Sequence, residues 1–319
     1  MPWLSAGLRR LCVCHIIAPR MIAFGCSVRV PEVYERQAKV GIERAAEEDS
    51  EIFIDAAAGS IARGYNLLLD CVAGREDLEA LVILHADAEI LDSDFCARLR
   101  AVLADPDVAV VGAVGTSGVR NIAWWDGEPG GSSAPYHYGE LGGGILHWRA
   151  DAGVSEFGEV ESLYGVMLAL SPWAVVHLRF DETIGMFHGY DFDICRQARA
   201  AGRKVVTAEL NIAHHHSLDL VKDSSTCVDS HMRAADRWGL GDEAEMSDDD
   251  WKVRAQRAEA SAAAARLLHA SRMLQAEATS NHHADQLDEI LSSSSWRLTE
   301  PVRASIRLAK AGRKRFSER

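Results

Sequence analysis

Two side chains able to bind a metal ion follow an apolar stretch in the first third of the chain. Residues 81–84 are apolar without alternation, which predicts a strand covered on both faces, and His85 and Asp87 come next. In open α/β sheets, ligands collect beyond the carboxyl ends of the strands. There Asp87 would give an oxygen ligand to a divalent cation that bridges two phosphates. The alternative is that Asp87 or Asp92 only caps a helix beginning near Ser93.

A second acidic group lies at the start of a predicted helix further along the chain. The segment 187–196, Phe-His-Gly-Tyr-Asp-Phe-Asp-Ile-Cys-Arg, leads into a helix that runs to Ala201 and stops at Gly202. A carboxylate at Asp191 that faces a cleft would take a proton from an attacking hydroxyl group, as general-base chemistry requires. The alternative is that Asp191 is only the N-cap of this helix.

Three consecutive histidines, His214 to His216, follow the apolar pair Ile212-Ala213. Neighbours on an extended chain point to opposite sides, so the three rings cannot all face one site. The middle His215, or the flanking pair, would join Asp87 around a metal ion. The alternative is a surface cluster with no ligand role.

The elements that would position these groups follow an α/β pattern. Strands are predicted at 21–28, 51–55 and 81–84, separated by a helix at 32–48 and a helix through Tyr65 and Leu69. This order predicts a parallel sheet with right-handed crossovers. No Gly-x-Gly-x-x-Gly follows the first strand, and no P-loop is present. The pattern continues with helices at 94–105 and 172–178 and strands at 108–114, 165–170 and 205–208.

The segment 115–144 is rich in Gly, Ser and aromatic residues and has little periodicity, so a long loop is predicted there. Its aromatic side chains either stack on sugar rings or bases, or anchor the loop to the core. The residues in question are Trp124, Trp125, Tyr136 and Tyr138.

Composition bounds the function. The 319 residues are 48% hydrophobic and 25% charged, which fits one large domain with an appendage, or two domains. A formal net charge of -13 argues against non-specific nucleic-acid binding, so small molecules or proteins are the expected partners. Seven cysteines without a Cys-x-x-Cys pair, and the lack of a run of roughly 18 apolar residues, predict a cytoplasmic protein. Residues 1–20 predict an extension outside the fold, with Met21 as the functional start.

The last quarter of the chain differs in composition from the rest. Residues 246–295 are rich in Ala, Glu, Arg, Gln and Leu and predict a long helix or coiled coil. A coiled coil would make the protein a homo-oligomer, and the alternative is a single exposed helix. Residues 297–319 contain eight Lys or Arg and two Asp or Glu, a local charge of +6. Such a segment would hold the protein at the anionic inner face of a membrane, and the alternative is a solvated basic end.

The order of these motifs resembles the family 2 glycosyltransferases of the GT-A fold, and more narrowly a subgroup named after a streptomycin-biosynthesis glycosyltransferase. The similarity rests on His85-x-Asp87, Phe180-Asp181-Glu182, Tyr190-Asp191-x-Asp193-x-Cys195 and the histidines at 214–216. The resemblance implies a Rossmann-like, mixed and mainly parallel sheet over residues 21–245. The helical segment 246–295 and the basic segment 296–319 would follow this domain.

The resemblance also implies a reaction. The protein would be a hexosyltransferase-like enzyme that transfers a sugar, with inversion, from a nucleotide sugar to a hydroxyl group of a glycan or lipid-linked acceptor. The reaction would need Mn²⁺ or Mg²⁺ and would belong to bacterial cell-surface polysaccharide synthesis. By this resemblance Asp191 is the catalytic base and Asp87 and His215 bind the metal. Ser27 and His85 would hold the nucleotide, His85 standing in place of the first Asp of the metal motif. Tyr164 stands where relatives carry Asp.

Two alternatives stay open. A sugar nucleotidyltransferase would share the sheet and the metal, but a Gly-rich, basic loop is expected after its first strand, and residues 25–31 supply only Arg29. A non-catalytic scaffold, with a decayed transferase domain and a working coiled coil, would form stable oligomers and bind no nucleotide.

Overall fold

The computed structural model describes residues 21–119, 128–129, 136–141, 144–148, 158–215 and 224–239, and further positions between 255 and 305, namely 255, 256, 258–262, 265, 269, 273, 280, 283–303 and 305. The predicted extension 1–20 lies outside the described residues, as do Trp124, Trp125 and His216.

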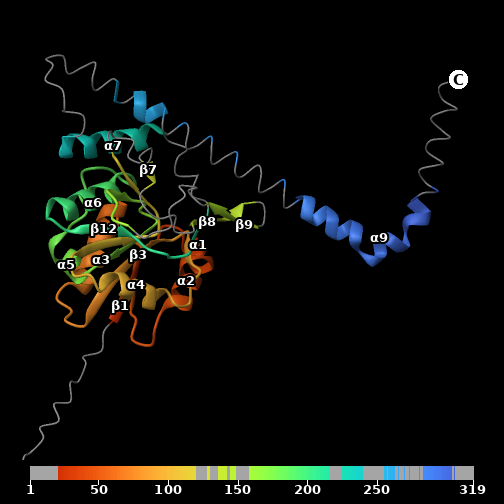
Figure 1. Cartoon of the computed structure of the whole chain (residues 1–319), viewed down its shortest axis with the longest axis horizontal. Coiled ribbons are helices and arrows are strands. Elements are labelled where there is room, and N and C mark those ends of the chain that lie inside the picture. Colours follow the sequence, from red (N-terminus) through yellow and green to blue (C-terminus); the bar gives the residue numbers. More distant parts are fainter. Residues whose placement is uncertain are drawn as a thin grey trace, which may run out of the picture.

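A six-stranded sheet forms the centre of the molecule (Figure 1). Its spatial order is β12-β5-β11-β3-β1-β2, and β11 alone in this sheet runs against the other strands. The mixed, mainly parallel sheet expected for a GT-A arrangement is therefore confirmed. The strands are β1 (Met21–Ser27), β2 (Ile52–Asp55), β3 (Leu78–His85), β5 (Val108–Gly112), β11 (Met167–Leu170) and β12 (Lys204–Thr207).

Helices cover both faces of this sheet, because its central strands are apolar on both sides. One core includes side chains of α3 (Ile61–Val72), α5 (Pro172–His177) and α6 (Tyr190–Ala200). The other includes side chains of α1 (Pro31–Arg36), α2 (Ala38–Ala45) and α4 (Phe95–Leu103). The single helix expected at 32–48 is broken into α1 and α2 at Gln37, whose ψ of -77° and φ of -125° are not helical.

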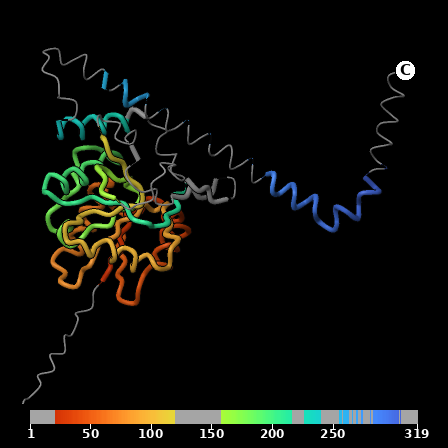
Figure 2. The backbone as a smooth tube through the Cα atoms, viewed as in Figure 1, coloured from red at the N-terminus to blue at the C-terminus, as the bar shows by residue number. Residues whose placement is uncertain are grey.

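The register of the sheet places the polar ends of three strands together. Ser27 at the end of β1 pairs with His85 at the end of β3, and on its other side with Asp55 at the end of β2. Because these strands are parallel, their carboxyl ends share one edge. Figure 2 shows the red and orange N-terminal segments interleaved with green segments from the middle of the chain.

Small sheets occupy the region where a long loop was expected, and that expectation is wrong in part. One sheet has the order β4-β13-β8-β9 and another the order β10-β6-β7. Each strand is short, and apart from the neighbours β8 and β9 several pair with partners far along the chain, such as β4 with β13, so the local pattern does not indicate them. The strands are β4 (Ala88–Ile90), β6 (Gly115–Ser117), β7 (Glu128–Pro129), β8 (Tyr136–Leu141), β9 (Gly144–Trp148), β10 (Ser162–Leu163) and β13 (Ile212–His215).

A glycine lets helix α2 approach strand β4 closely. A Cβ on Gly41 would lie 2.3 Å from the backbone nitrogen of Ile90, so no larger residue fits without moving the backbone. Arg44 of the same helix donates to the Ile90 carbonyl and forms an ion pair with Glu89 at 2.9 Å. Helix α2 therefore fixes the strand that directly follows Asp87.

Helix α7 (Ser224–Trp238) lies against α6, on the far side of that helix from the sheet (Figure 1). Beyond it, helical residues are described at 283–292 and in α9 (Ser294–Leu298). Among the described residues no helix combines the length and apolar character needed to cross a membrane. The division at residues 245 and 295, and the coiled coil, stay predictions.

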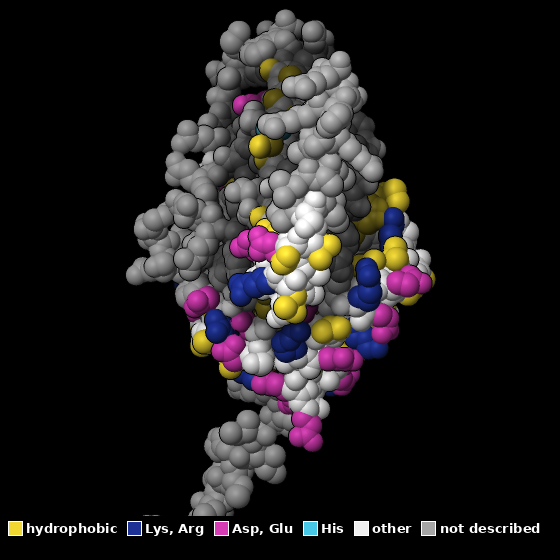
Figure 3. All heavy atoms as spheres, turned by 90° about the vertical axis from the view of Figure 1, so that its right-hand side faces the viewer, with side chains coloured by type: hydrophobic (Ala, Val, Ile, Leu, Met, Phe, Trp, Pro, Cys, Tyr) yellow, Lys and Arg dark blue, Asp and Glu magenta, His cyan; other side chains and the backbone are white. Residues whose placement is uncertain are grey.

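Charges of both signs are interspersed over the described surface shown in Figure 3. Several form ion pairs there or elsewhere, such as Arg75 with Glu51 at 2.9 Å and Lys204 with Asp105 at 2.7 Å. Exposed pairs of this kind contribute little stability, about 0 to 1 kcal/mol each. The stability of the fold therefore comes from the two cores.

Candidate functional site

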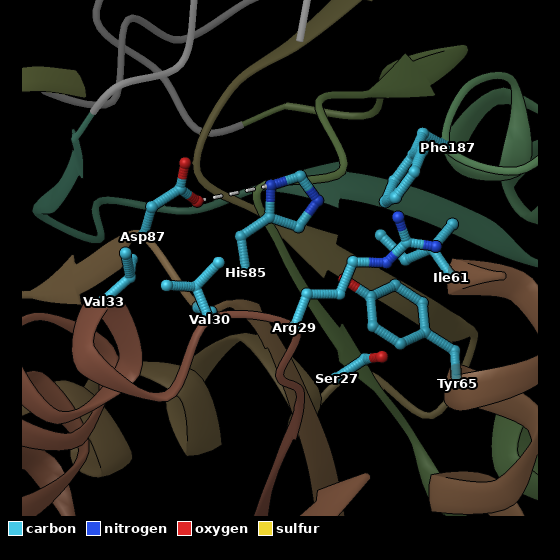
Figure 4. Close-up of a pocket in the computed structure, with 10 residues that line it drawn as sticks. Ser27, Arg29, Val30, Val33, Ile61, Tyr65, His85, Asp87 and Phe187 are labelled. Carbon is cyan, nitrogen blue, oxygen red and sulfur yellow. Dashed lines mark ion pairs between the residues drawn. The ribbon is translucent and has the colours of Figure 1, made fainter. Parts of the chain in front are cut away.

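A cavity of about 420 Å³ opens at the carboxyl edge of the main sheet (Figure 4). Most of its wall is apolar, and the polar groups come from the ends of β1 and β3, from the turns that follow them and from Tyr65 of α3. A volume of this size suits a small-molecule ligand. The lining residues are Ser27, Arg29, Val30, Val33, Ile61, Tyr65, His85, Ala86, Asp87 and Phe187.

Three metal-binding side chains gather beside this cavity. One ligand atom each from His85, Asp87 and His214 lies within 4.8 Å of the other two. His214 Nε2 is 3.3 Å and His85 Nδ1 is 3.8 Å from Asp87 Oδ1, the latter pair drawn as a dashed line in Figure 4. His85 ends β3, Asp87 lies in the turn that leads to β4, and β13 brings His214 because it pairs with β4.

The protonation states of this cluster favour a cation. Burial lowers the pKa of His85 to about 4, and His214 and His188 act in the same direction. Burial opposes ionisation of Asp87, but His214 and His85 outweigh it and hold the pKa of this carboxyl at about 2. At neutral pH His85 is neutral and Asp87 is anionic, as metal ligation requires. The donor set therefore fits a divalent cation.

His215 does not join this cluster, although the sequence indicated it as the metal ligand. Successive side chains of β13 point to opposite sides, so His214 faces Asp87 and His215 faces away. His215 Nε2 instead lies 3.2 Å from Glu89 Oε2. Only its backbone nitrogen contacts the site, donating to the Asp87 carbonyl at 2.8 Å. On geometry, His214 takes the place expected for His215.

Asp191 is held in the first turn of α6 by backbone donors. Its Oδ2 accepts from Gly165 N at 3.1 Å and its Oδ1 from Phe192 N at 2.9 Å. Burial raises the pKa of Asp191 to about 6, against the lowering effect of these bonds. The N-cap is Gly189, with φ of 82°, so capping does not account for Asp191. A carboxylate with such a pKa is poised for proton transfer near neutral pH.

A chain of hydrogen bonds joins the metal-binding cluster to Asp191. His85 Nε2 lies 2.6 Å from the Tyr190 hydroxyl, which donates to the Gly165 carbonyl at 3.0 Å. Gly165 N then donates to Asp191. A Cβ at Gly165 would lie 2.2 Å from the Tyr190 hydroxyl oxygen, so this junction requires glycine. Among the described residues Asp191 is outside the cavity lining, and this chain sets it beside the cavity.

Comparison with known proteins identifies the family at this point. The model of a glycosyltransferase-like family matches residues 32–235, more than half of the chain. The chain belongs to this family. It is also similar to the streptomycin biosynthesis protein StrF of Streptomyces griseus, with 28% identity over 200 residues, which is 62% of this chain and 67% of that protein.

Solved glycosyltransferases show a weaker likeness. The mannosyltransferase PcManGT of Pyrobaculum calidifontis, solved with GDP-Man and Mn²⁺, is 14% identical, with a TM-score of 0.44 over 90% of this chain and 84% of that chain. GalNAc-T7, solved with UDP, GalNAc and Mn²⁺, is 10% identical, with a TM-score of 0.45 over 75% of this chain and 55% of that chain. The matched sequence of residues 32–235 carries the family membership.

Ser27, expected to hold the nucleotide, lines the cavity of this glycosyltransferase-like protein. Its hydroxyl donates to Asp55 Oδ2 at 3.1 Å, and Asp55 Oδ1 accepts from Ala57 N and Ala58 N at 3.1 and 3.2 Å. A Cβ at Gly64 would lie 2.6 Å from the Ser27 hydroxyl, so α3 approaches this pair closely. Ser27 and Asp55 thus form a rigid polar corner of the site.

Sequence reasoning missed two side chains that close the cavity of this family member. The Arg29 guanidinium lies 4.0 Å from the centroid of the Phe187 ring and donates to the Gly59 carbonyl at 3.1 Å. Figure 4 shows both side chains at one end of the lining. Arg29 could have been found as the one basic residue in the turn after β1. Phe187 gave no signal, because its loop is brought there by tertiary contacts.

Tyr164 packs in a small apolar cluster with Ile184, Phe192 and Ala234. Its backbone nitrogen donates to the Val114 carbonyl at 2.9 Å. Tyr164 is therefore part of the packing between α6 and α7, directly before Gly165.

Proposed function

We propose that this protein transfers a sugar from a nucleotide-sugar donor to a hydroxyl group of an acceptor, assisted by a divalent cation. The observation that carries the proposal is the His85, Asp87 and His214 cluster at the cavity, linked by hydrogen bonds to a carboxylate with a raised pKa. A cation site and a general base side by side are the two parts that a single displacement at an anomeric carbon needs.

The cation would be held by Asp87 and His214, with His85 as the third ligand. Two imidazoles and one carboxylate favour a transition metal such as Mn²⁺ over Mg²⁺, which prefers oxygen ligands. When bound, the cation would neutralise the charge that develops on the departing nucleoside diphosphate. PcManGT and GalNAc-T7 were solved with Mn²⁺, and this describes those two proteins. The choice of Mn²⁺ for this chain is based on its own ligand residues.

The remaining residues would bind and orient the two substrates. Ser27, fixed by Asp55, offers its hydroxyl oxygen to the nucleoside, and Arg29 is the basic side chain of the lining available to the diphosphate. Asp191 takes the proton of the acceptor hydroxyl as this oxygen attacks. Attack on the side opposite the leaving group would invert the anomeric centre.

We place the acceptor among cell-surface glycans and their lipid-linked precursors. The basic segment 296–319 supports this, because its local charge fits an anionic membrane surface on the cytoplasmic side. The helical segment 246–295 would assemble copies of the chain. A scaffold without activity has the same tail, so ligand binding separates the two functions.

The test is binding of UDP, GDP, dTDP and CDP, each in the presence of Mn²⁺ or of EDTA. Binding is measured as the stabilisation of the protein against thermal unfolding. One nucleotide at about 100 times its Kd should stabilise the wild type by about 2.7 kcal/mol in Mn²⁺. Asp87→Ala should lose this effect, and Asp70→Ala, which changes a carboxylate with 62% side-chain exposure, should keep it. Stabilisation by none of the four nucleotides would reject the proposal and favour the scaffold.

A further inference from the structure

The hydroxyl group of Tyr190 contacts the metal-binding histidine at the atom that faces away from the metal-binding cluster. Tyr190 is buried in the first turn of α6, and its oxygen lies 2.6 Å from His85 Nε2. His85 Nδ1, on the other side of the ring, is the atom directed at Asp87. Whether Nε2 carries the proton of the neutral imidazole therefore decides whether Nδ1 has a lone pair free to bind a cation.

Hydrogen-bond accounting fixes that arrangement. The Gly165 carbonyl can only accept, whereas His85 Nε2 and the Tyr65 hydroxyl, which also hydrogen-bonds to Tyr190, can each donate. The arrangement that satisfies all of these buried groups gives the single hydroxyl proton of Tyr190 to the Gly165 carbonyl, at 3.0 Å. The bond to His85 must then run in the other direction, from Nε2–H to the tyrosine oxygen. A neutral imidazole carries one N–H, so Nδ1 is left with a lone pair.

The distance to Asp87 supports the same assignment. At 3.8 Å, the gap between His85 Nδ1 and Asp87 Oδ1 is too long for a hydrogen bond. A lone pair facing a carboxylate at this distance is unfavourable unless a cation lies between them. His214 Nε2 borders the same space, 3.3 Å from the same carboxylate oxygen.

We propose that Tyr190 is a positioning residue that fixes the Nε2–H tautomer of His85 and so presents Nδ1 to the divalent cation. This inference rests on the proposed function. The packing suits the role, because the Tyr190 ring is held edge-on by Tyr65 at 5.5 Å between centroids and lies 6.1 Å from Phe180. Gly165 links this residue to its neighbour Asp191, so one turn of α6 positions the metal ligand and carries the base.

The test is Mn²⁺ affinity of the full chain, measured by electron paramagnetic resonance, for wild type and Tyr190→Phe. The ring remains, so folding should be kept, while Mn²⁺ affinity should fall about 10- to 100-fold, as for loss of other groups that orient a metal-binding histidine. Transfer activity should fall at low Mn²⁺ and recover at saturating Mn²⁺. Tyr34→Phe, which removes a hydroxyl from a tyrosine buried in the other core, is the control and should leave affinity unchanged.

A second measurement needs no variant. Nitrogen-15 spectra of the histidines in metal-free wild type should show His85 as the Nε2–H tautomer, assigned by comparison with His85→Gln. The Nδ1–H tautomer, or Mn²⁺ affinity of Tyr190→Phe within twofold of wild type, would overturn the inference while leaving the proposed function in place. If the wild type binds a nucleotide but no Mn²⁺, this inference and the role of a divalent cation in the proposed function are both overturned. If the wild type binds neither, this inference and the whole proposed function are overturned.

Discussion

At the scale of single residues, Asp191 combines a raised pKa with backbone bonds that hold its carboxylate in place. As general base it must be ionised, so kcat/KM for transfer should fall by about tenfold per pH unit below about pH 6. Asp191→Asn should bind nucleotide with wild-type affinity and lose transfer. A pH profile that is flat down to pH 5 would exclude Asp191 as the base.

The ionised carboxylate of Asp191 should also lower the free energy of unfolding. Its pKa of about 6 lies above the ordinary value of 3.8, so the folded state binds this proton more tightly than the unfolded chain. The charged form therefore destabilises the fold above about pH 6, and the cost disappears as pH falls to about 4. Asp191→Asn should be more stable than wild type at pH 8, on the order of 1 kcal/mol after allowing for partial exposure, and equally stable at pH 4. Urea unfolding at both values checks this.

The adjacent histidines of β13 give a matched pair. Both are buried to the same extent, 7% exposed, but only His214 lies in the metal-binding cluster. His214→Ala should lose Mn²⁺ affinity by more than about 10-fold, and His215→Ala should keep it and lose only the contact with Glu89. Isothermal titration with Mn²⁺ decides between them. The reverse result would restore His215 as the ligand and require a different register of β13.

At the scale of elements, a buried carboxylate joins helix α7 to helix α6. Asp193 of α6 is fully buried and accepts from Trp238 Nε1 at 2.8 Å and from Gln197 at 2.7 Å, and Arg237 pairs with it at 3.0 Å. Burial raises the pKa of Asp193 despite these partners. Helix α7 also fills the space beside the loop that carries Phe187, since a Cβ at Gly185 would lie 2.2 Å from the Ser230 hydroxyl oxygen.

Trp238→Phe should therefore destabilise the protein by about 1 to 3 kcal/mol, because a buried carboxylate loses one donor. Replacing the acceptor as well should add little further cost, so the double variant with Asp193→Asn should be less destabilised than the sum of the single changes. Guanidinium unfolding of the three variants measures this coupling. Additive effects would mean that the tryptophan acts only through its ring.

At the scale of the whole molecule, we predict that α7 ends the unit that builds the site, although Ala260 of the segment 246–295 is buried against Val228 and Ala235 of α7. Removal of residues 246–319 should leave nucleotide and Mn²⁺ binding unchanged and lower the free energy of unfolding by about 1 kcal/mol, because Val228 and Ala235 lose their contact with Ala260. If the tail assembles copies of the chain, sedimentation should show fewer chains per particle for the truncated protein than for the full chain. Flotation of the protein with anionic vesicles should also be lost. Removal from residue 224 onward, which takes α7 away, should abolish binding.

The local pattern of the chain determined most of the main sheet and the identity of its polar ends. Unbroken apolar runs predicted β1, β3 and β5 to within a few residues, because a strand buried on both faces admits no polar side chain. His85 and Asp87 also stood out as polar groups directly after a buried strand, and Asp191 stood out as a carboxylate at the start of a predicted helix.

Tertiary structure alone decided which of these groups meet. The choice of His214 over His215 depends on the register between β4 and β13, and a shift of one residue would exchange them. The role of Tyr190, the closure of the cavity by Phe187 and the attachment of α7 to Asp193 each depend on contacts between segments far apart in sequence. Such contacts leave no periodic signal, because each is a single meeting of side chains that the packing of the whole domain brings about.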